Sequence, residues 1–397
     1  MSPATTELSQ QIMDSPIMIV DDVMINRVFL EKTLRACGFR NLLCVANAEE
    51  VFSKINDFQP DLVLLDILMP DGMDGFECCE ALRSQEKFRD LPILIETSIV
   101  EPELRVKAFK KGATDFVSKP IDADELCARV IVHLEKRHSL KTLQQYKSRI
   151  ETELESARQL QLGILPEQEK IQDYNKRCGL DIAAAFESAS EIGGDFWGLE
   201  NLSPEQTALW LVDFSGHGMP AALNAFRLHT YLKEHIPETA RPGEYLSKLN
   251  DKLLNLLPRG QFAMMFYGII DRQNSQLHFS RAYMPNPIVL HRATGKAEKI
   301  SGSAPPLGIG MHSYSTETIP FTTNDVLLVY SDALTETSNM KREFLTEESL
   351  ARLIEENSSA SVSELKDILL RQFKEHTGGI LRDDLTIVVC AHTKKPS

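Results

Sequence analysis

Short apolar runs alternate with helix-length amphipathic segments between residues 17 and 137, and this alternation constrains the fold more than any other feature of the chain. Each apolar run is long enough for one buried strand. Continuous apolar strands separated by helices indicate a parallel sheet covered on both faces. We therefore expect a doubly wound α/β domain with a five-stranded parallel sheet. The five runs are Ile17–Val20, Leu42–Val45, Leu62–Leu65, Ile93–Ile95 and Phe116–Val117.

Polar residues at the carboxyl ends of these runs predict a ligand site. Asp21 and Asp22 follow the first run, Asp66 the third, Thr97 the fourth and Lys119 the fifth. In an open α/β sheet, ligands bind beyond the carboxyl ends of the strands. Three carboxylates held together repel one another unless a divalent cation neutralises them. We therefore expect the three aspartates to form a Mg²⁺ site.

These residues resemble the receiver domain of bacterial response regulators, a flavodoxin-like fold, over about residues 15–137. The resemblance implies that Asp66 accepts a phosphoryl group, as an acyl phosphate, from a sensor histidine kinase or a phosphotransfer protein. It also implies a cis peptide bond at Lys119-Pro120. The other implied roles are Asp22 as a direct Mg²⁺ ligand, Asp21 as a ligand through water, the carbonyl of Leu68 as a further ligand, Thr97 as a hydrogen-bond donor to the phosphoryl group, Lys119 as its counter-charge, and Phe116 as the switch aromatic.

The loop after Asp66 departs from the family pattern by one extra residue between Pro70 and Asp74. Because this residue lies beyond the implied carbonyl ligand, we expect the chemistry of the pocket to be kept. We expect the geometry of the loop and the choice of partner to differ.

Residues 122–165 contain almost no glycine or proline before Gly163, which predicts one long helix. A 3,4 spacing of residues in its second half fits about three heptads. This spacing predicts a coiled coil over residues 138–166 that joins two chains as a homodimer. The alternative is a single amphipathic helix packed on its own domain. The predicted seam is Leu140, Leu143, Lys147, Ile150, Leu154, Ala157 and Gln161, in which the lysine and the glutamine are the weak positions.

Strand-like runs and helical stretches are partly segregated between residues 180 and 392, which favours an α+β domain with a layered β-sandwich flanked by helices. The runs are Ile182–Phe186, Ala208–Val212, Met264–Ile270, Leu277–Phe279, Val326–Tyr330 and Leu385–Val389. The helical stretches lie at residues 219–235, 242–257, 346–357 and 362–377.

Four short strings in this region carry aspartates. Asp195 lies in Gly-Gly-Asp-Phe, Asp213 begins Asp-Phe-Ser-Gly-His-Gly-Met-Pro-Ala-Ala, Asp332 ends Tyr-Ser-Asp, and Asp383 begins Asp-Asp-Leu-Thr. Aspartates that flank buried strands place carboxylates near a core, which is costly unless they are paired or bound to metal. Glycines beside Asp195 and Asp213 let the backbone approach a ligand closely.

The four strings resemble those of metal-dependent PP2C-type protein phosphatases, in the stage-II-sporulation and stress-regulator branch, over about residues 157–392. The resemblance implies a site for two Mn²⁺ or Mg²⁺ ions, between which an activated water attacks a phosphoserine or phosphothreonine. The implied ligands are Asp213 to both ions, Asp195 and the carbonyl of Phe214 to one, and Asp332 and Asp383 to the other, with Asp384 either replacing Asp383 or lying behind it.

Three further positions in this region leave alternatives open. His217 either orients solvent and protonates the leaving alkoxide, or packs within its loop. Ala333 stands where the family has glycine, and it adds strain if the backbone there is left-handed. The string from Tyr283 to Pro287 replaces the usual Gly-His-x-Pro-Pro. Neither of these two departures removes an implied metal ligand.

Residues 157–166 match the regulatory helix that precedes this phosphatase domain in the family. The order of the domains therefore suggests that phosphorylation of Asp66 controls the phosphatase through the linker helix. The resemblance implies a STAS-type anti-sigma-factor antagonist as substrate, in a partner-switching pathway. The alternative is a phosphorylation-controlled scaffold or sigma-factor adaptor with a weak or inactive phosphatase fold. The two departures favour this alternative, and the retained aspartates oppose it.

Charge and cysteine content bear on the partners and the compartment. The net charge of −14, from 43 Lys+Arg and 57 Asp+Glu, disfavours binding to nucleic acid or to an anionic membrane. Seven irregularly spaced cysteines argue against a disulfide framework and for a reducing compartment. No signal peptide is recognisable, and no apolar run approaches the roughly 20 residues of a membrane span. We therefore expect a cytoplasmic protein.

The expected organisation has four parts. Residues 1–14 are expected to be disordered and residues 15–137 to form the receiver domain. Residues 138–166 are expected to form the linker helix, and residues 167–397 the phosphatase domain.

Overall fold

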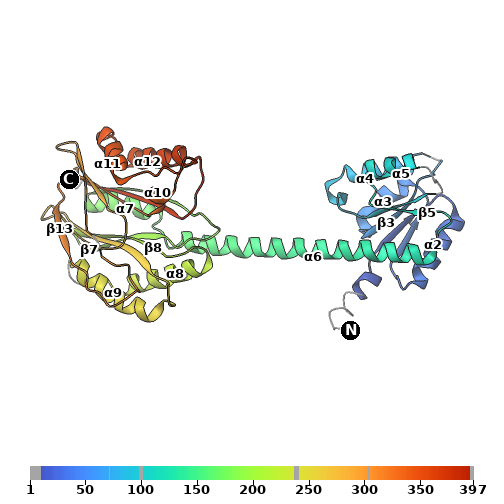
Figure 1. Ribbon diagram of the computed structural model, residues 1–397, viewed down its shortest axis with the longest axis horizontal. Coiled ribbons are helices and arrows are strands. Elements are labelled where there is room, and N and C mark those ends of the chain that lie inside the picture. Colours follow the sequence, from blue (N-terminus) through green and yellow to red (C-terminus); the bar gives the residue numbers. More distant parts are fainter. Residues whose placement is uncertain (1–9, 71, 98–101, 237–240, 303, 394–397) are drawn as a thin grey trace. The chain divides into compact units, whose positions relative to one another are not determined.

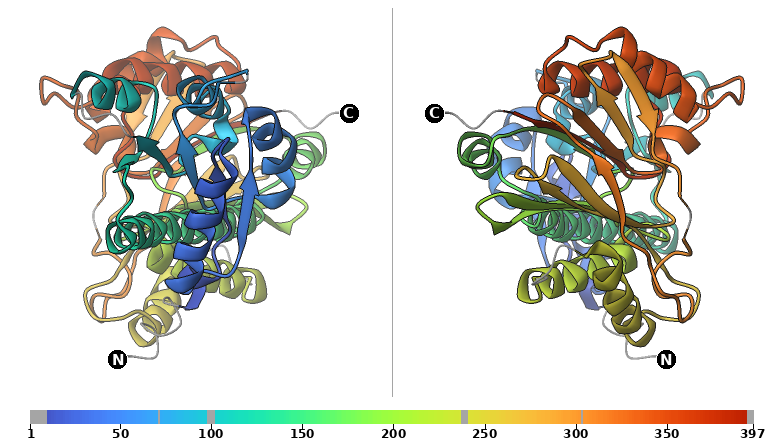
Figure 2. Two further views of the ribbon diagram at one scale, coloured as in Figure 1. Left: turned by 90° about the vertical axis from the view of Figure 1, so that its right-hand side faces the viewer. Right: turned by 90° about the vertical axis from the view of Figure 1, so that its left-hand side faces the viewer.

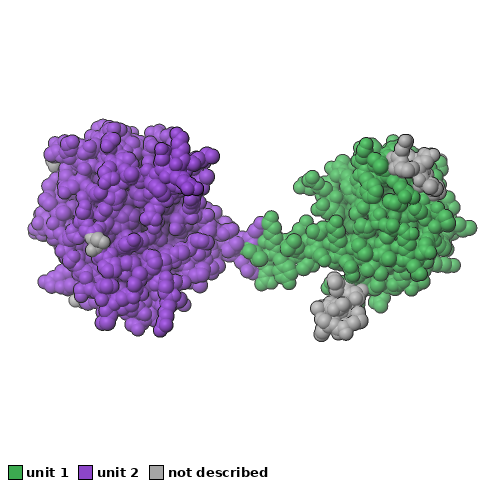
Figure 3. All heavy atoms as spheres, in the orientation of Figure 1, with its two compact units in different colours: residues 1–150 green, residues 151–397 purple. Residues whose placement is uncertain are grey.

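The computed structural model describes residues 10–70, 72–97, 102–236, 241–302 and 304–393 (Figure 1). The chain divides into two compact units, residues 1–150 and 151–397 (Figure 3). We call them the N-terminal and the C-terminal unit and describe each by itself. No helix in the described ranges is both long and apolar enough to cross a membrane.

The N-terminal unit is built on a parallel five-stranded sheet in the order β2-β1-β3-β4-β5. The strands are β1 (Ile17–Val20), β2 (Leu42–Val45), β3 (Leu62–Asp66), β4 (Ile93–Thr97) and β5 (Asp115–Ser118). The helices are α2 (Met24–Ala36), α3 (Ala48–Phe58), α4 (Gly75–Arg83), α5 (Pro102–Lys110) and α6 (Ala123–Leu162), with a short 3-10 helix at Glu86–Phe88. The predicted doubly wound fold is confirmed.

Two apolar clusters, one on each face, hold this sheet. On one face, Leu30 of α2 and Val130 of α6 pack against strand residues such as Leu64. On the other face, Val51 of α3 and Phe76 of α4 pack against alternate residues of the same strands. Because both faces of the sheet are covered, each strand contains an apolar run, and these runs allowed all five strands to be predicted.

The expectation of disorder over residues 1–14 is wrong for its last part. Residues 10–13 form a helical turn, and Ile12 is buried in the cluster beneath α2 and α6. One apolar contact with the core is enough to order this short segment. Residues 1–9 lie outside the described residues.

The expectation that the cysteines are unpaired is wrong for one pair. A disulfide joins Cys37, at the end of α2, to Cys127 in the second turn of α6, with their Cα atoms 6.4 Å apart. The two cysteines are 90 residues apart in the chain. They meet only because α2 and α6 pack on the same face of the sheet, so the spacing of cysteines in the sequence carried no sign of the pair.

Helix α6 is continuous over 40 residues and passes from the N-terminal unit into the C-terminal unit. Leu140, Leu143 and Ile150 of the predicted seam are exposed in the single chain. Gln161 was predicted as a seam position, and this assignment is wrong. Its side chain is buried in the C-terminal unit, where it binds the backbone of another segment.

The C-terminal unit contains two antiparallel five-stranded sheets, in the orders β13-β10-β9-β8-β7 and β12-β11-β14-β15-β6. The first sheet consists of β7 (Phe196–Ser203), β8 (Gln206–Phe214), β9 (Ala263–Asp271), β10 (Gln276–Ala282) and β13 (Glu317–Pro320). The second consists of β6 (Leu180–Glu187), β11 (Ile288–His291), β12 (Lys296–Lys299), β14 (Val326–Tyr330) and β15 (Leu385–His392).

The two sheets pack face to face and helices cover their outer faces, as Figures 1 and 2 show. Leu211 and Phe266 of the first sheet share one buried cluster with Val329 and Val388 of the second. Helices α8 and α9 pack on the first sheet, and α11 and α12 on the second. The helices are α7 (Gln168–Cys178), α8 (Met219–Glu234), α9 (Pro242–Leu256), α10 (Ala333–Glu336), α11 (Glu347–Glu356) and α12 (Val362–Thr377). The expected β-sandwich flanked by helices is confirmed.

Candidate functional sites

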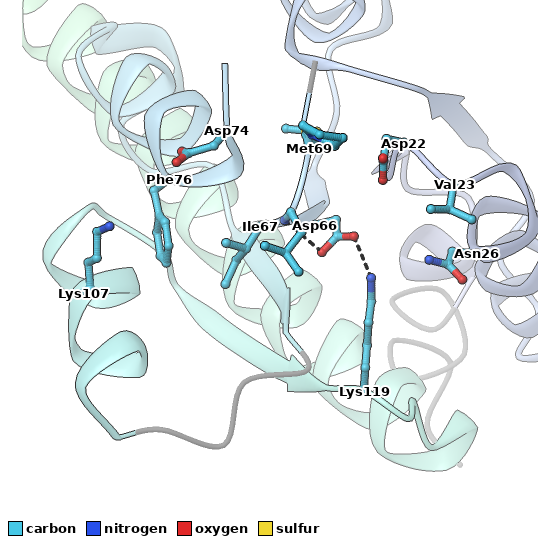
Figure 4. Close-up of a pocket in the computed structure, with 12 residues that line it drawn as sticks. Asp22, Val23, Asn26, Asp66, Ile67, Met69, Asp74, Phe76, Lys107 and Lys119 are labelled. Carbon is cyan, nitrogen blue, oxygen red and sulfur yellow. Dashed lines mark hydrogen bonds and ion pairs between the residues drawn. The ribbon is translucent and has the colours of Figure 1, made fainter. Parts of the chain in front are cut away.

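The N-terminal unit gathers its predicted site residues at the carboxyl ends of the strands. One carboxylate oxygen from each of Asp21, Asp22 and Asp66 lies within 4.8 Å of the others. Lys119 Nζ lies 2.7 Å from Asp66 Oδ2 and 3.0 Å from Asp21 Oδ2. Figure 4 shows Lys119 extending to Asp66, with Asp22 and Asn26 lying to one side of this pair. Three oxygen donors at this spacing fit a Mg²⁺ ion.

The three aspartates differ in how the protein holds them. Asp21 is fully buried, and its Oδ1 accepts a hydrogen bond of 2.8 Å from the backbone N–H of Val23, while the amide of Asn26 also donates to its carboxylate. Asp22 and Asp66 line a cavity of about 660 Å³, together with Leu68. This arrangement is compatible with the roles expected for Asp21, as a ligand through water, and for Asp22, as a direct ligand.

Burial and neighbouring charge set the ionisation of this pocket. Burial raises the pKa of Asp66, and the Lys119 ammonium opposes this rise. Burial alone would lower the pKa of Lys119, but its hydrogen bond to Asp66 and the nearby carboxylates outweigh burial and raise it. The lysine is therefore held as a cation beside the carboxylate that is predicted to receive the phosphoryl group.

Glu96 belongs to this pocket, although the sequence analysis gave it no role. Its side chain is fully buried in β4, and neither carboxylate oxygen has a hydrogen-bond partner within the described ranges. Lys119 Nζ lies 3.7 Å from Oε2. Burial raises the pKa of Glu96 to about 8. An acidic residue directly after an apolar strand run, before Thr97, was the signal in the sequence that could have identified it.

The remaining receiver residues also lie near this edge. Thr97 ends β4 and is buried. Phe116 lies in β5, with the Arg105 guanidinium 4.6 Å from its ring centre and Phe109 edge-on at 6.2 Å. The peptide bond between Lys119 and Pro120 is cis, as predicted.

The extended loop after Asp66 returns to ordinary geometry before α4. Gly72 takes a left-handed φ of +98°, which favours glycine. Asp74 then caps α4, and its side chain and that of Glu77 each accept a hydrogen bond from the other's backbone N–H. Position 71 lies outside the described residues.

In the C-terminal unit, strand register places the predicted aspartates near one edge of the sandwich. Asp213 lies at the end of β8, and Asp195 directly precedes β7, its antiparallel neighbour. Asp332 follows β14, and Asp383 lies just before β15, which pairs with β14. The Asp213 carboxylate senses the charges of Asp332 and Asp383, so the four side chains form one electrostatic cluster.

Asp195 is the member of this cluster whose surroundings best fit a cation. Its side chain is fully buried, Oδ2 accepts a hydrogen bond of 2.7 Å from Thr386 Oγ1, and Oδ1 has no partner among the described residues. Burial, followed by the charges of Asp213 and Asp384, raises its pKa well above the ordinary value. A buried carboxylate with a free oxygen beside other carboxylates fits a divalent metal ion, which would supply the missing partner.

The other implied ligands share this electrostatic environment. Burial, followed by the charge of Asp332, raises the pKa of Asp213 well above its ordinary value. Burial and the charges of Glu336 and Asp383 raise the pKa of Asp332 to about 6. The ring of Phe214, whose carbonyl is an implied ligand, is buried in the cluster between β8 and α8.

Asp384 does not fit the role of a metal ligand, because protein donors occupy both of its oxygens. Oδ1 accepts hydrogen bonds from Ser188 Oγ and the Ala189 N–H, both 2.9 Å, and Oδ2 accepts one of 2.6 Å from the Gly194 N–H. Of the two alternatives, this geometry favours Asp383 as the ligand. Asp384 instead positions the loop that leads to Asp195.

The end of α6 contacts the same loop. Gln161 Nε2 donates to the carbonyl oxygen of Gly193, and Gln161 Oε1 accepts from the N–H of the same residue. A Cβ on Gly193 would collide with the Asp384 carboxylate, so this close approach requires glycine. Helix α6 therefore contacts the backbone two residues from Asp195.

The structure describes the surroundings of His217, Ala333 and Tyr283, the positions for which the sequence left alternatives open. His217 is exposed between Gly216 and Gly218, both with left-handed φ, so it does not pack within its loop. Ala333 begins helix α10 and does not have a left-handed φ, so the backbone strain considered for alanine at this position is absent. Tyr283 instead takes a left-handed φ of +56°.

A parallel-sheet domain with an aspartate–lysine pocket is followed in this chain by a β-sandwich with an aspartate cluster, the arrangement expected of a receiver domain and a PP2C-like domain. Comparison of the sequence with protein families matches both domains. Residues 17–131 match the response regulator receiver domain, and residues 203–393 match stage II sporulation protein E. The chain therefore combines a response regulator receiver domain with a PP2C-type phosphatase domain of the stage II sporulation protein E family, whose members are metal-dependent.

Individual relatives match parts of the chain. Transcriptional regulatory protein YvrH of Bacillus subtilis is 34% identical over 128 residues, which cover 32% of this chain and 52% of that protein. Response regulator PleD of Caulobacter vibrioides is 35% identical over 118 residues, covering 30% and 26%. The matched part thus spans about half of the first relative and a quarter of the second. The SiaA-PP2C domain of Pseudomonas aeruginosa, with a TM-score of 0.56 and 17% identity over 62% of this chain and 98% of that one, shares the fold.

Proposed function

We propose that phosphorylation of Asp66 controls a phosphoserine/phosphothreonine protein phosphatase in the C-terminal unit, and that helix α6 transmits the signal. The observation that carries the proposal is the pair of hydrogen bonds between Gln161 and Gly193. Through them, the last turn of α6 holds the backbone that leads to Asp195. A change in the rotation or pairing of α6 moves Gln161 and thereby the Asp195 carboxylate.

In the receiver domain, the Asp66 carboxylate attacks the phosphoryl group offered by a histidine kinase or a phosphotransfer protein. Lys119, held as a cation 2.7 Å from Asp66, pairs with the incoming negative charge. Thr97, at the end of the neighbouring strand, donates a hydrogen bond to a phosphoryl oxygen. The phosphoryl group adds negative charge to the pocket, and helix α6 transmits the resulting change to the phosphatase domain.

In the phosphatase domain, the aspartate cluster would hold two Mn²⁺ or Mg²⁺ ions. When bound, these ions supply an activated water and offset charge on the phosphoryl oxygens. The holding residues are Asp213 for both ions, Asp195 and the Phe214 carbonyl for one, and Asp332 and Asp383 for the other. Asp384 keeps the 188–194 loop in place, and exposed His217 donates a proton to the leaving alkoxide.

The linker supports assembly of two chains. Leu140, Leu143 and Ile150 are exposed at heptad spacing on α6, and a second copy of the helix would bury them. Sedimentation of the full chain tests this: a Leu143→Glu variant is expected to be monomeric where the wild type is dimeric. We further propose that the substrate is a STAS-type anti-sigma-factor antagonist in a partner-switching pathway.

Release of phosphate from a phosphoserine protein in the presence of Mn²⁺ tests the activity. Asp213→Asn is expected to abolish it, and an Asp213→Asn variant as active as the wild type would refute the assigned chemistry. The scaffold alternative is supported by the altered string at residues 283–287 and opposed by the unpartnered Oδ1 of Asp195. Calorimetric titration with Mn²⁺ of the full chain that carries Asp66→Asn separates the phosphatase from the scaffold. This substitution alters the receiver site, so Mn²⁺ binding by the phosphatase domain is still seen if the site of that domain is intact.

A further inference from the structure

Tyr283 combines a left-handed backbone with an exposed ring. Its φ is +56°, and among the described non-glycine residues with positive φ it is the single aromatic one. Such a conformation places Cβ close to the carbonyl oxygen and is rare for bulky residues. The side chain is 61% exposed, so packing in the core does not offset the strain. Strain of this kind is retained mainly where a side chain serves a function.

Strand register places Tyr283 at the same edge of the sheet as Asp213. Met265 in β9 pairs with Val212 in β8 on one side and with Ala282 in β10 on the other. Asp213, the next residue of β8, pairs with Met264, and Tyr283 directly follows the last paired residue of β10 at the same edge. At about 4.8 Å between neighbouring strands, their backbones lie roughly 10 Å apart.

The turn that carries Tyr283 is held from both sides. The Tyr283 N–H donates to the carbonyl oxygen of Ala304 (2.9 Å), and Arg281 donates to the carbonyl oxygen of Met284 (2.7 Å). The side-chain amide of Asn286, which stands where the family has proline, donates to both carboxylate oxygens of Glu347 (2.9 and 2.8 Å).

The same turn is tied to the strand that leads to Asp332. The Tyr330 hydroxyl donates a hydrogen bond of 3.0 Å to the carbonyl oxygen of Asn286. The segment 283–287 therefore runs from the edge that carries Asp213 to the strand that carries Asp332. The exposed Tyr283 is therefore carried by a backbone that is held on both sides, at the sheet edge that carries Asp213.

We propose that Tyr283 binds the protein substrate by packing its ring against the polypeptide segment that flanks the phosphorylated serine. This inference rests on the proposed phosphatase function. A tyrosine ring offers a large contact area at low cost in side-chain entropy, which is why tyrosine is common at binding surfaces. Because the Tyr283 backbone lies roughly 10 Å from that of Asp213, a polypeptide substrate spans the two positions and a small phosphate ester does so less.

The test compares two substrates on the full chain with Mn²⁺: phosphorylated casein, as a phosphoserine protein, and p-nitrophenyl phosphate. Tyr283→Gly and Tyr283→Ala are expected to lower kcat/KM for casein about tenfold, mainly through KM, and the loss is expected to be several times larger than for the small ester. Tyr283→Phe is expected to keep the wild-type KM. Tyr283→Gly should also raise the melting temperature, because glycine accepts the left-handed φ without strain.

Ser275→Gly is the matched control. Ser275 also has a positive φ, of +52°, but lies at the opposite end of β10. It should raise the melting temperature and leave both activities unchanged. The affinity for casein is measured directly on the same variants. If the wild type shows no turnover, that result counts against the phosphatase function alone, and the affinities still test the role of Tyr283. Unchanged KM and unchanged affinity in Tyr283→Gly would overturn the proposal.

Discussion

Gln161 Nε2 donates a hydrogen bond of 2.8 Å to the carbonyl oxygen of Gly193, and Gln161 Oε1 accepts one of 2.9 Å from the N–H of the same residue. The glutamine side chain is 1% exposed. Asp384 binds the following N–H, that of Gly194. The end of the linker helix and Asp384 thus fix two successive peptide units just before Asp195.

Gln161→Ala removes both hydrogen bonds and leaves a buried N–H and a buried carbonyl unpaired, at about 1–3 kcal/mol each. We expect the loop before Asp195 to loosen and the apparent affinity for Mn²⁺ to fall about 10–100-fold, as when partners behind metal ligands are removed. Titration of phosphatase activity with Mn²⁺ measures this change. Gln159→Ala is the control, because Gln159 is exposed on the same helix and binds Glu155. Equal Mn²⁺ affinity in the two variants would contradict the coupling role of Gln161.

Asp383 and Asp384 are neighbours in the chain but are expected to respond oppositely to substitution. Asp384→Ala leaves Ser188 Oγ and two backbone N–H groups without their acceptor, so the free energy of unfolding should fall by about 2–4 kcal/mol, with or without metal. Asp383→Asn removes a carboxylate whose pKa is raised by burial, so it should leave the metal-free fold intact and weaken Mn²⁺ binding. Thermal unfolding in EDTA and in Mn²⁺ separates the two effects. The reverse pattern would make Asp384 the ligand.

The sequence predicted most of the aspartates of both sites because they lie beside apolar strand runs, whereas Asp195 was identified only by its Gly-Gly-Asp-Phe string. It could not assign Gln161, whose heptad spacing is equally consistent with a dimer seam. The contact with Gly193 joins residues 32 positions apart and exists only once the helix meets the sandwich. Asp384 was ambiguous for the same reason, since the donors to its oxygens come from residues 190–196 positions away.

Glu96 should make the stability of the receiver domain depend on pH. Burial raises its pKa from 4.5 to about 8. A carboxyl group with a raised pKa opposes folding when ionised, so its cost grows as the pH rises from about 4.5 to about 8, by at most about 1.4 kcal/mol per pH unit. Glu96→Gln should therefore be more stable than the wild type at pH 8, and the difference should vanish toward pH 4.5.

Scanning calorimetry of the full chain at several pH values checks this prediction, with the receiver transition identified by its shift in beryllofluoride. Glu86→Gln serves as the control, because Glu86 is exposed. A Glu96→Gln variant whose stability follows the wild type at every pH would mean that Glu96 is not buried as a carboxylate.

The disulfide between Cys37 and Cys127 should stabilise the receiver domain. Breaking a cross-link of this kind costs about 2–4 kcal/mol, so a reducing agent is expected to lower the melting temperature of the wild type. Cys37→Ser should already melt at the lower temperature and respond no further. Cys44→Ser, which removes an unpaired cysteine, should keep the response. A wild type that is indifferent to reduction would show that the two sulfurs are not joined in solution.

The fold was predictable where a strand contains an apolar run. All five strands of the receiver sheet contain one, and each was predicted. In the sandwich, β12 (Lys296–Lys299) and β13 (Glu317–Pro320) are edge strands, half-exposed and polar, so their sequences carry no strand signal. Strands β7 and β11 and helices α7 and α10 were also absent from the prediction. The layered class was still correct because the central strands of both sheets are apolar.

The most direct test of the account measures phosphate release from a phosphoserine protein by the full chain in Mn²⁺, with and without beryllofluoride as an acyl-phosphate mimic at Asp66. We predict that beryllofluoride changes the rate in the wild type, that Asp66→Asn removes this response, and that Gln161→Ala weakens it. A rate that is measurable and identical with and without beryllofluoride would contradict control of the phosphatase by the receiver domain.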